Sequence, residues 1–124
     1  APDMNRRTWR MLEAAVRKVA LKRDIVEVYA ISGPVFDISK PFSKIGDDVV
    51  VPHAFFKSVL IENNKGKINF CSFLLPNKKE DISYKDCTVS VEYLEFRTGL
   101  QLWNRLEGVK VQKAKTKSNL GPIT

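Results

Sequence analysis

The chain has 124 residues, which suffice for one domain with a modest hydrophobic core. A hydrophobic content of 44% excludes a disordered tail, and no apolar run approaches the roughly 20 residues that a transmembrane helix requires. Lysine and arginine total 21 against 14 aspartates and glutamates, giving a formal net charge of +7 that favours polyanionic partners without identifying one.

The first predicted element is a helix from Asp3 to about Lys22. Alanine, leucine, methionine and arginine dominate this segment, and all are good helix formers. Asp3 is expected to cap the start of the helix. Apolar side chains recur at helical spacing at Trp9, Leu12, Val16, Val19 and Ala20. The helix should therefore be amphipathic.

A sheet is predicted between residues 25 and 75. Residues 25–31 (IVEVYAI) have the composition of a strand, which Gly33 and Pro34 are expected to end within residues 32–36. Residues 37–48 are polar and should form a loop. Further strands are predicted at 49–51, 55–62 and 67–75. The run Asn63-Asn64-Lys65-Gly66 predicts a hairpin between the last two, so the sheet should be antiparallel.

The C-terminal part contains one more predicted element. After a charged loop at 76–86, a short helix is expected from Val91 to Arg97 or Thr98, ended by Gly99. No pattern continues beyond Val109, and lysines at 110, 113, 115 and 117 make residues 109–124 a basic tail behind one domain portion at 1–108. The tail either holds nucleic acid electrostatically or is solvated and disordered.

The cysteine and histidine content excludes one class of site. Cys71, Cys87 and the single histidine, His53, lack the close spacing of zinc ligands. We therefore expect two buried thiols rather than a zinc site or a disulfide. His53 lies in a strand segment far in sequence from the first helix, and a structural or surface role is expected for it.

Four residues of the predicted first helix recur at intervals of four: Asn5, Trp9, Glu13 and Arg17. Residues at this spacing share a helix face. An amide oxygen, a carboxylate and a guanidinium are the groups that magnesium-assisted phosphodiester cleavage uses. Eight helical residues separate Asn5 from Glu13 by about 12 Å, too far for both to ligate one ion easily. Spacing alone favours a plain polar face with an ordinary Glu13–Arg17 pair.

A resemblance to a known family changes this interpretation. Residues 2–13 (PDMNRRTWRMLE) resemble the N-x-x-x-W-x-x-L-E helix of the ββα-metal nucleases, in the endonuclease G and Serratia nuclease group. Further similar segments follow in order: residues 28–36 (VYAISGPVF), 45–60 (IGDDVVVPHAFFKSVL), 73–77 (FLLPN) and 91–99. The resemblance implies an α+β ββα-metal nuclease fold, an antiparallel sheet with a metal-site helix. Only its C-terminal portion is expected here, because the family's D-R-G-H motif would precede Ala1.

The resemblance also implies roles for individual residues. Asn5 would hold a Mg²⁺ ion, or Mn²⁺ in its place, and Glu13 would position the water shell of the metal. Arg17 would bind the phosphate and stabilise it during the reaction. The histidine of the D-R-G-H motif, the family's general base, is expected to be missing from this chain. Lys57 is equally compatible with a structural role and with a phosphate-facing one.

The function implied is a magnesium-dependent, non-specific endonuclease that hydrolyses DNA and RNA. The isolated chain is predicted to be inactive without the N-terminal part of its domain. The expected partners are this N-terminal part, DNA, RNA and a second copy of the chain in a homodimer. No membrane insertion is expected. The expected compartment is the mitochondrion, or the periplasm or the outside of the cell after export. The alternative is a catalytically inactive module on the same scaffold that binds nucleic acid or protein.

Overall fold

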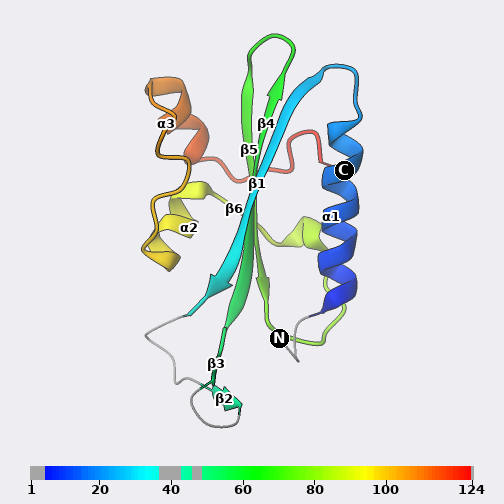
Figure 1. Ribbon diagram of the computed structural model, residues 1–124, viewed down its shortest axis with the longest axis vertical. Coiled ribbons are helices and arrows are strands. Elements are labelled where there is room, and N and C mark those ends of the chain that lie inside the picture. The colour runs from blue at the N-terminus through cyan, green and yellow to red at the C-terminus, as the bar shows by residue number, and fades with distance from the viewer. Residues whose placement is uncertain (1–4, 37–42, 46–48, 124) are drawn as a thin grey trace.

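The computed structural model describes residues 5–36, 43–45 and 49–123, and its centre is a four-stranded antiparallel sheet. The strands lie in the order β1 (Ile25–Val35), β4 (Ala54–Asn63), β5 (Ile68–Pro76) and β6 (Thr88–Val89). Helix α1 (Arg6–Ala20) covers one face of the sheet, and α2 (Val91–Thr98) and α3 (Val109–Lys115) cover the other (Figure 1). The expected α+β class and antiparallel sheet are confirmed, with β6 as an additional strand.

Helix α1 begins later than the sequence predicts. Its N-cap is Asn5, whose side-chain oxygen accepts the backbone N–H groups of Arg7 at 3.0 Å and Thr8 at 3.1 Å. The prediction that Asp3 caps the helix was therefore wrong, and Asp3 lies outside the described residues. Asparagine and aspartate are about equally good N-caps, so local preference could not choose between the two positions.

Strand β1 is longer than predicted, because it continues through Gly33 and Pro34 to Val35. Proline lacks the N–H that a central strand needs, but β1 is an edge strand with a partner on one side only. Gly33 lies opposite Phe56 of β4, and a Cβ atom there would come within 2.9 Å of that ring. Gly33 therefore allows close packing of the strand and does not end it.

The predicted strands at 49–51, 55–62 and 67–75 are confirmed as β3 (Val49–Val51), β4 and β5. The β4–β5 hairpin turns where expected, with Gly66 at a φ of +78° and the Asn63 side chain accepting two backbone N–H groups. The expected loop at 37–48 contains β2 (Ser43–Ile45), which pairs with β3; residues 37–42 and 46–48 lie outside the described part.

The short helix at 91–98 is also confirmed. In α2 the side chain of Ser90 accepts the N–H of Tyr93, and Gly99 ends the helix in a left-handed conformation. The charged loop before it contains a 3-10 turn, η1 (Tyr84–Asp86), and then β6. The structure therefore has more regular elements in this part than the sequence predicts.

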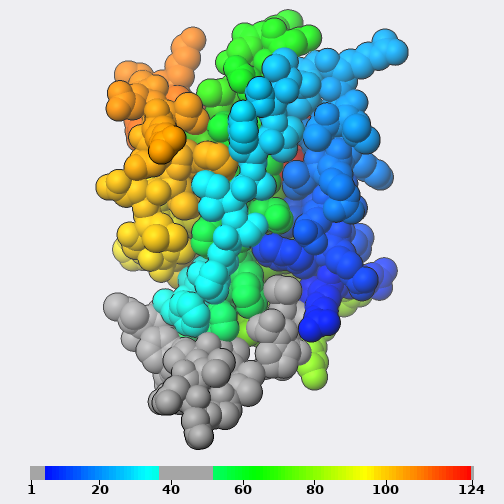
Figure 2. Space-filling view, viewed as in Figure 1, coloured from blue at the N-terminus to red at the C-terminus, as the bar shows by residue number. Residues whose placement is uncertain are grey.

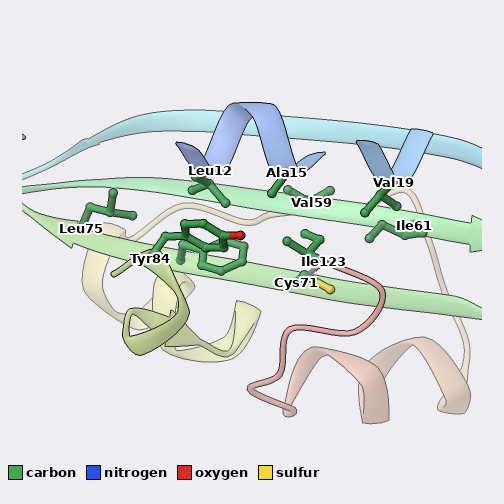
Figure 3. Close-up of a cluster of buried hydrophobic side chains, with 10 residues drawn as sticks. Leu12, Ala15, Val19, Val59, Ile61, Cys71, Leu75, Tyr84 and Ile123 are labelled. Atoms are coloured by element: carbon green, nitrogen blue, oxygen red, sulfur yellow. The ribbon is translucent and has the colours of Figure 1, made fainter. Parts of the chain in front are cut away.

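Alternation along β4 divides the interior into two hydrophobic cores. Val59 and Ile61 point toward α1, whereas Phe56 and Leu60 point toward α2 and α3. Figure 3 shows the core under α1, where Leu12 and Val19 of the helix lie over side chains of β4 and β5. This period-two alternation is the expected behaviour of a strand that is covered on both faces.

The C-terminal segment is folded, whereas one alternative predicted a solvated, disordered tail. Residues Val109–Lys115 form α3, and Val111 and Ala114 pack against the core on its side of the sheet. The chain then returns toward α1, where Ile123 is 0% exposed inside the other core (Figures 1 and 3). Seven residues rich in lysine give little local signal for a helix, because the contacts that stabilise α3 and Ile123 come from elsewhere in the chain.

Both cysteines are free thiols, but the prediction that both are buried was correct only for Cys71. Cys71 is fully buried in the α1 core, and Cys87 is half-buried. Burial raises the pKa of the Cys71 thiol to about 12, because the thiolate would lose its hydration there. Among the described residues, none of the helices is long and apolar enough to cross a membrane.

We predict that Ile123→Ala lowers the free energy of unfolding by about 2–4 kcal/mol, the usual effect of removing a fully buried aliphatic side chain. Val109→Ala is the control, since Val109 is 82% exposed and should change stability by less than about 0.5 kcal/mol. Urea unfolding followed by circular dichroism measures both. Equal stability of the two variants would mean that the C-terminal segment does not stabilise the α1 core.

Candidate functional site

Asn5, the expected metal ligand, lies where α1 begins and contacts the loop between β5 and η1. Its amide nitrogen donates to the backbone oxygen of Glu80 and lies 3.5 Å from the Asp81 carboxylate. Its amide oxygen is the N-cap of α1. Both ends of the side chain are therefore held, and the orientation of the amide is fixed.

Two further contacts join the first turn of α1 to the same loop. The hydroxyl of Thr8 donates to the backbone oxygen of Ile82 at 2.6 Å, and Arg7 forms an ion pair with Asp81 at 3.5 Å. The ion pair is exposed and contributes little to stability, whereas Thr8 is buried. The loop therefore positions the start of α1 mainly through Asn5 and Thr8.

The groups around Asn5 fit a magnesium ion in part. Mg²⁺ prefers oxygen ligands and usually retains several waters, so one amide oxygen with the Asp81 carboxylate nearby is a suitable donor set. No group of three or more His, Cys, Asp or Glu side chains that could hold a metal is found in the described part of the chain. Because the Asn5 oxygen accepts two N–H groups, binding an ion would require it to release one of them.

Trp9 and Glu13 lie further along α1, near a buried cation on β4. The Lys57 side chain is 9% exposed; its ammonium lies 4.9 Å from the centroid of the Trp9 ring and donates to the Ser32 hydroxyl at 3.1 Å. Phe55 packs edge-on against Trp9, with ring centroids 6.5 Å apart. Lys57 is thus held by a cation–π contact and one hydrogen bond.

Burial lowers the pKa of Lys57, because the ammonium loses hydration, and the nearby Glu13 carboxylate opposes this effect. Lys57 therefore couples electrostatically to Glu13, the residue expected to organise the water around a metal. The sequence left the role of Lys57 open. The structure shows that its amino group is enclosed between α1, β1 and β4.

Arg17 lies one turn beyond Glu13 on the exposed side of α1. Within the described residues, no hydrogen bond or ion pair joins Asn5, Glu13 and Arg17 to one another. The regular spacing of four therefore produces three different environments: a cap, a half-buried carboxylate and an exposed guanidinium. The roles expected for these residues remain predictions.

His53 lies at the junction between the end of β1 and the start of β4. Its backbone N–H donates to Val35 at 2.9 Å, and its backbone oxygen accepts the N–H of Asn77 at 3.0 Å. The Asn77 side chain donates to Pro52 at 2.8 Å, and its buried amide oxygen has no hydrogen-bond partner among the described residues. Asn77, the last residue of the FLLPN segment, thus connects the end of β5 to the residues that precede β4.

Sequence reasoning did not find the contribution of Glu80, Asp81 and Ile82 to the Asn5 site. The only signal was the density of charge in the loop at 76–86. Contacts between residues more than 70 positions apart in the chain leave no periodic pattern. They become visible only when the helix is placed on the sheet.

Comparison with known proteins shows that the sequence of this chain is similar to nucleases. A family model described as DNA/RNA non-specific endonuclease matches residues 1–108. The chain is 27% identical over 124 residues to the nuclease of Serratia marcescens, covering 97% of this chain and 46% of that protein. It is 32% identical over 120 residues to mitochondrial endonuclease G of Caenorhabditis elegans, covering 88% of this chain and 38% of that protein.

One solved structure with a similar fold is the crystal structure of the EndoG/EndoGI complex, which concerns the mechanism of EndoG inhibition. The TM-score is 0.64 at 24% identity, over 80% of this chain and 44% of that one. At this identity the likeness concerns the fold. The chain spans less than half the length of each of these relatives.

We predict a pH-dependent effect of Lys57→Met. Because the folded pKa of Lys57 is lowered, the unfolded chain binds more protons than the folded one between that pKa and 10.5. Wild-type stability should therefore rise relative to Lys57→Met as the pH increases through this window. Urea unfolding at pH 7 and pH 10 measures the difference.

Lys18→Met is the matched control, because Lys18 is exposed and its substitution should leave the pH dependence of stability unchanged. If the stability difference between wild type and Lys57→Met is the same at both pH values, the Lys57 ammonium is not buried as described.

Proposed function

Because this chain belongs to the DNA/RNA non-specific endonuclease family, we propose that it is the metal-site portion of an enzyme that hydrolyses phosphodiester bonds in DNA and RNA. The observation that carries the proposal is the start of α1, where the β5–η1 loop holds the amide nitrogen of Asn5 and the first turn of α1 holds its amide oxygen. A fixed amide oxygen, on a side chain whose nitrogen lies 3.5 Å from the Asp81 carboxylate, is a suitable anchor for a hydrated divalent ion.

We assign the metal, Mg²⁺ or Mn²⁺, to Asn5. When bound, such an ion neutralises charge on the phosphate and stabilises the leaving oxygen. The contribution of the protein is orientation: Glu80 and Asp81 hold the amide nitrogen, and this directs the amide oxygen. The Asp81 carboxylate is close enough to accept a hydrogen bond from water near Asn5.

Glu13 and Arg17 are assigned to water and phosphate. The half-buried carboxylate of Glu13, with the Lys57 ammonium nearby, would accept hydrogen bonds from ordered water. Arg17 is exposed, so its guanidinium is free to donate two parallel hydrogen bonds to a phosphate. No contact here favours one base over another, which agrees with binding through backbone electrostatics.

We assign no general base to this chain. The sequence contains no D-R-G-H motif, and its single histidine, His53, directly precedes β4, where its backbone makes strand-end contacts. We therefore propose that the base comes from outside these 124 residues and that the chain alone does not cleave. We also propose that the whole protein is mitochondrial or exported and that it forms a homodimer.

One observation favours a second function, a binding module without catalysis. The oxygen of Asn5 already accepts two N–H groups of α1, which satisfies a neutral amide without any metal. In that case the net charge of +7 and the exposed basic side chains would bind nucleic acid, and Asn5 would be only a helix cap.

We predict that the native protein that contains this chain nicks supercoiled plasmid with Mg²⁺, that EDTA abolishes nicking, and that the 124-residue chain alone is inactive. Asn5→Ser should lower the rate by about 100-fold or more, since it removes the metal anchor. Serine keeps the helix cap, so the fold should be preserved. Asn104→Ala, at an exposed position, is the control.

The binding-module function makes the opposite prediction for the same assay. The native protein would then shift plasmid in a gel at low salt without cleaving it, and Asn5→Ser would alter neither property. Full nicking activity in Asn5→Ser would exclude Asn5 as the metal anchor.

A further inference from the structure

A basic groove lies between the end of the β4–β5 hairpin and α3. Its volume is about 650 Å³, and five lysines line it. Lys65 and Lys67 come from the hairpin, Lys110 and Lys113 come from α3, and Lys117 lies two residues after the end of α3. We call this feature the lysine groove. Figure 2 shows the hairpin end (green) and α3 (orange) side by side at the upper end of the molecule.

The charges of the lysine groove are not compensated by the protein. None of its twelve lining residues is acidic, and within the described chain none of the five lysines forms an ion pair or donates a side-chain hydrogen bond. All five side chains are exposed. Like charges that converge without a partner repel one another, so they attract a polyanion and raise its local concentration.

Other lysines of the same chain show the contrast. Lys115, on α3 itself, is 7% exposed and donates to the backbone oxygen of Leu102 at 2.8 Å. Lys22 donates to the backbone oxygen of Pro122 at 2.9 Å. These two side chains hold parts of the fold together, whereas those of the lysine groove have no such structural role.

The position of the groove is fixed by apolar contacts beneath it. Ile68 and Phe70 of β5 and Val111 and Ala114 of α3 line its floor and belong to the core on this side of the sheet. The lysines of α3 therefore face those of the hairpin at a defined separation. This arrangement arises only because α3 is a packed helix.

The groove is separate from the Asn5 site. Asn5 caps the beginning of α1, whereas the hairpin end contacts the loop that follows the helix, through the hydrogen bond from Asn64 to Asp24. The 15 residues of α1 separate these ends by about 22 Å. The two sites also lie on opposite faces of the sheet (Figure 1).

We propose that the lysine groove is a second binding site for the phosphate backbone of nucleic acid, which holds a stretch of the strand away from the cleavage site. This inference rests on the proposed nuclease function for the identity of the polyanion. Five spaced ammonium groups over 650 Å³ match a chain of phosphates better than a single phosphate ion, which would contact one or two of them. Lysine binds phosphate as a point charge, so the contact is independent of sequence.

The test compares two triple variants of the full chain. Lys110→Gln, Lys113→Gln and Lys117→Gln remove three charges from the groove. Lys18→Gln, Lys85→Gln and Arg105→Gln remove three exposed charges elsewhere, so both variants lower the net charge of +7 by three. Fluorescence anisotropy with a labelled 30-base-pair duplex in EDTA gives Kd at several salt concentrations.

The groove variant should bind the duplex at least about tenfold more weakly near 0.1 M salt. The slope of its log binding constant against log salt concentration should be shallower by about 2–3. The control variant should change the slope by less than about one unit. Equal weakening of both variants would show diffuse attraction and overturn the proposal, as would a groove variant that binds like wild type. If poly-glutamate binds wild type but not the groove variant, and duplex binding by the groove variant is unchanged, the proposal is overturned and the groove is assigned to an acidic protein instead.

Failure of this inference and failure of the proposed function are distinguishable. EDTA prevents cleavage, so the anisotropy measurement reports binding alone, whereas plasmid nicking reports catalysis. If the native protein nicks plasmid and the groove variant binds duplex like wild type, only the proposal about the lysine groove is overturned. A groove variant with the expected loss in a protein that never nicks overturns only the nuclease function.

Discussion

The two-sided burial of β4 is the constraint on which the rest of the molecule depends. Every residue from 56 to 61 is buried; Val59 and Ile61 belong to the α1 core, and Phe56 and Leu60 belong to the α2–α3 core. A shift of one residue in the pairing with β1 or β5 would exchange the two sets and place Lys57 in the core under α2. The register therefore also fixes the position of Trp9 and Glu13 relative to the Lys57 ammonium.

Where the sequence predicts the fold correctly, the signal is local. The turn ending at Gly66 and the stop at Gly99 depend on backbone conformations that glycine adopts readily, so both hairpin and helix end were predicted. Where the sequence fails, the deciding contact is distant. Pro34 remains in a strand because β1 is at the edge of the sheet, and Ile123 is buried because α1, more than 100 residues earlier, covers it.

The candidate site shows the same division. The family resemblance identified Asn5, Glu13 and Arg17 as a set, but it did not reveal that Asn5 is also the cap of α1 and is held by the β5–η1 loop. A helix N-terminus carries partial positive charge, which opposes a cation. The carboxylate of Asp81 beside it offsets this effect, so the loop is as important to the proposed metal site as the helix is.

The burial of Ile123 has a consequence for biosynthesis. Helix α1 is synthesised more than 100 residues before Ile123, so the core beneath it is complete only after Ile123 has left the ribosome. Until then the apolar face of α1 lacks part of its cover. A chain that lacks Ile123 would expose this face and be prone to aggregation, so the order of synthesis makes the arrival of Ile123 a late step in folding.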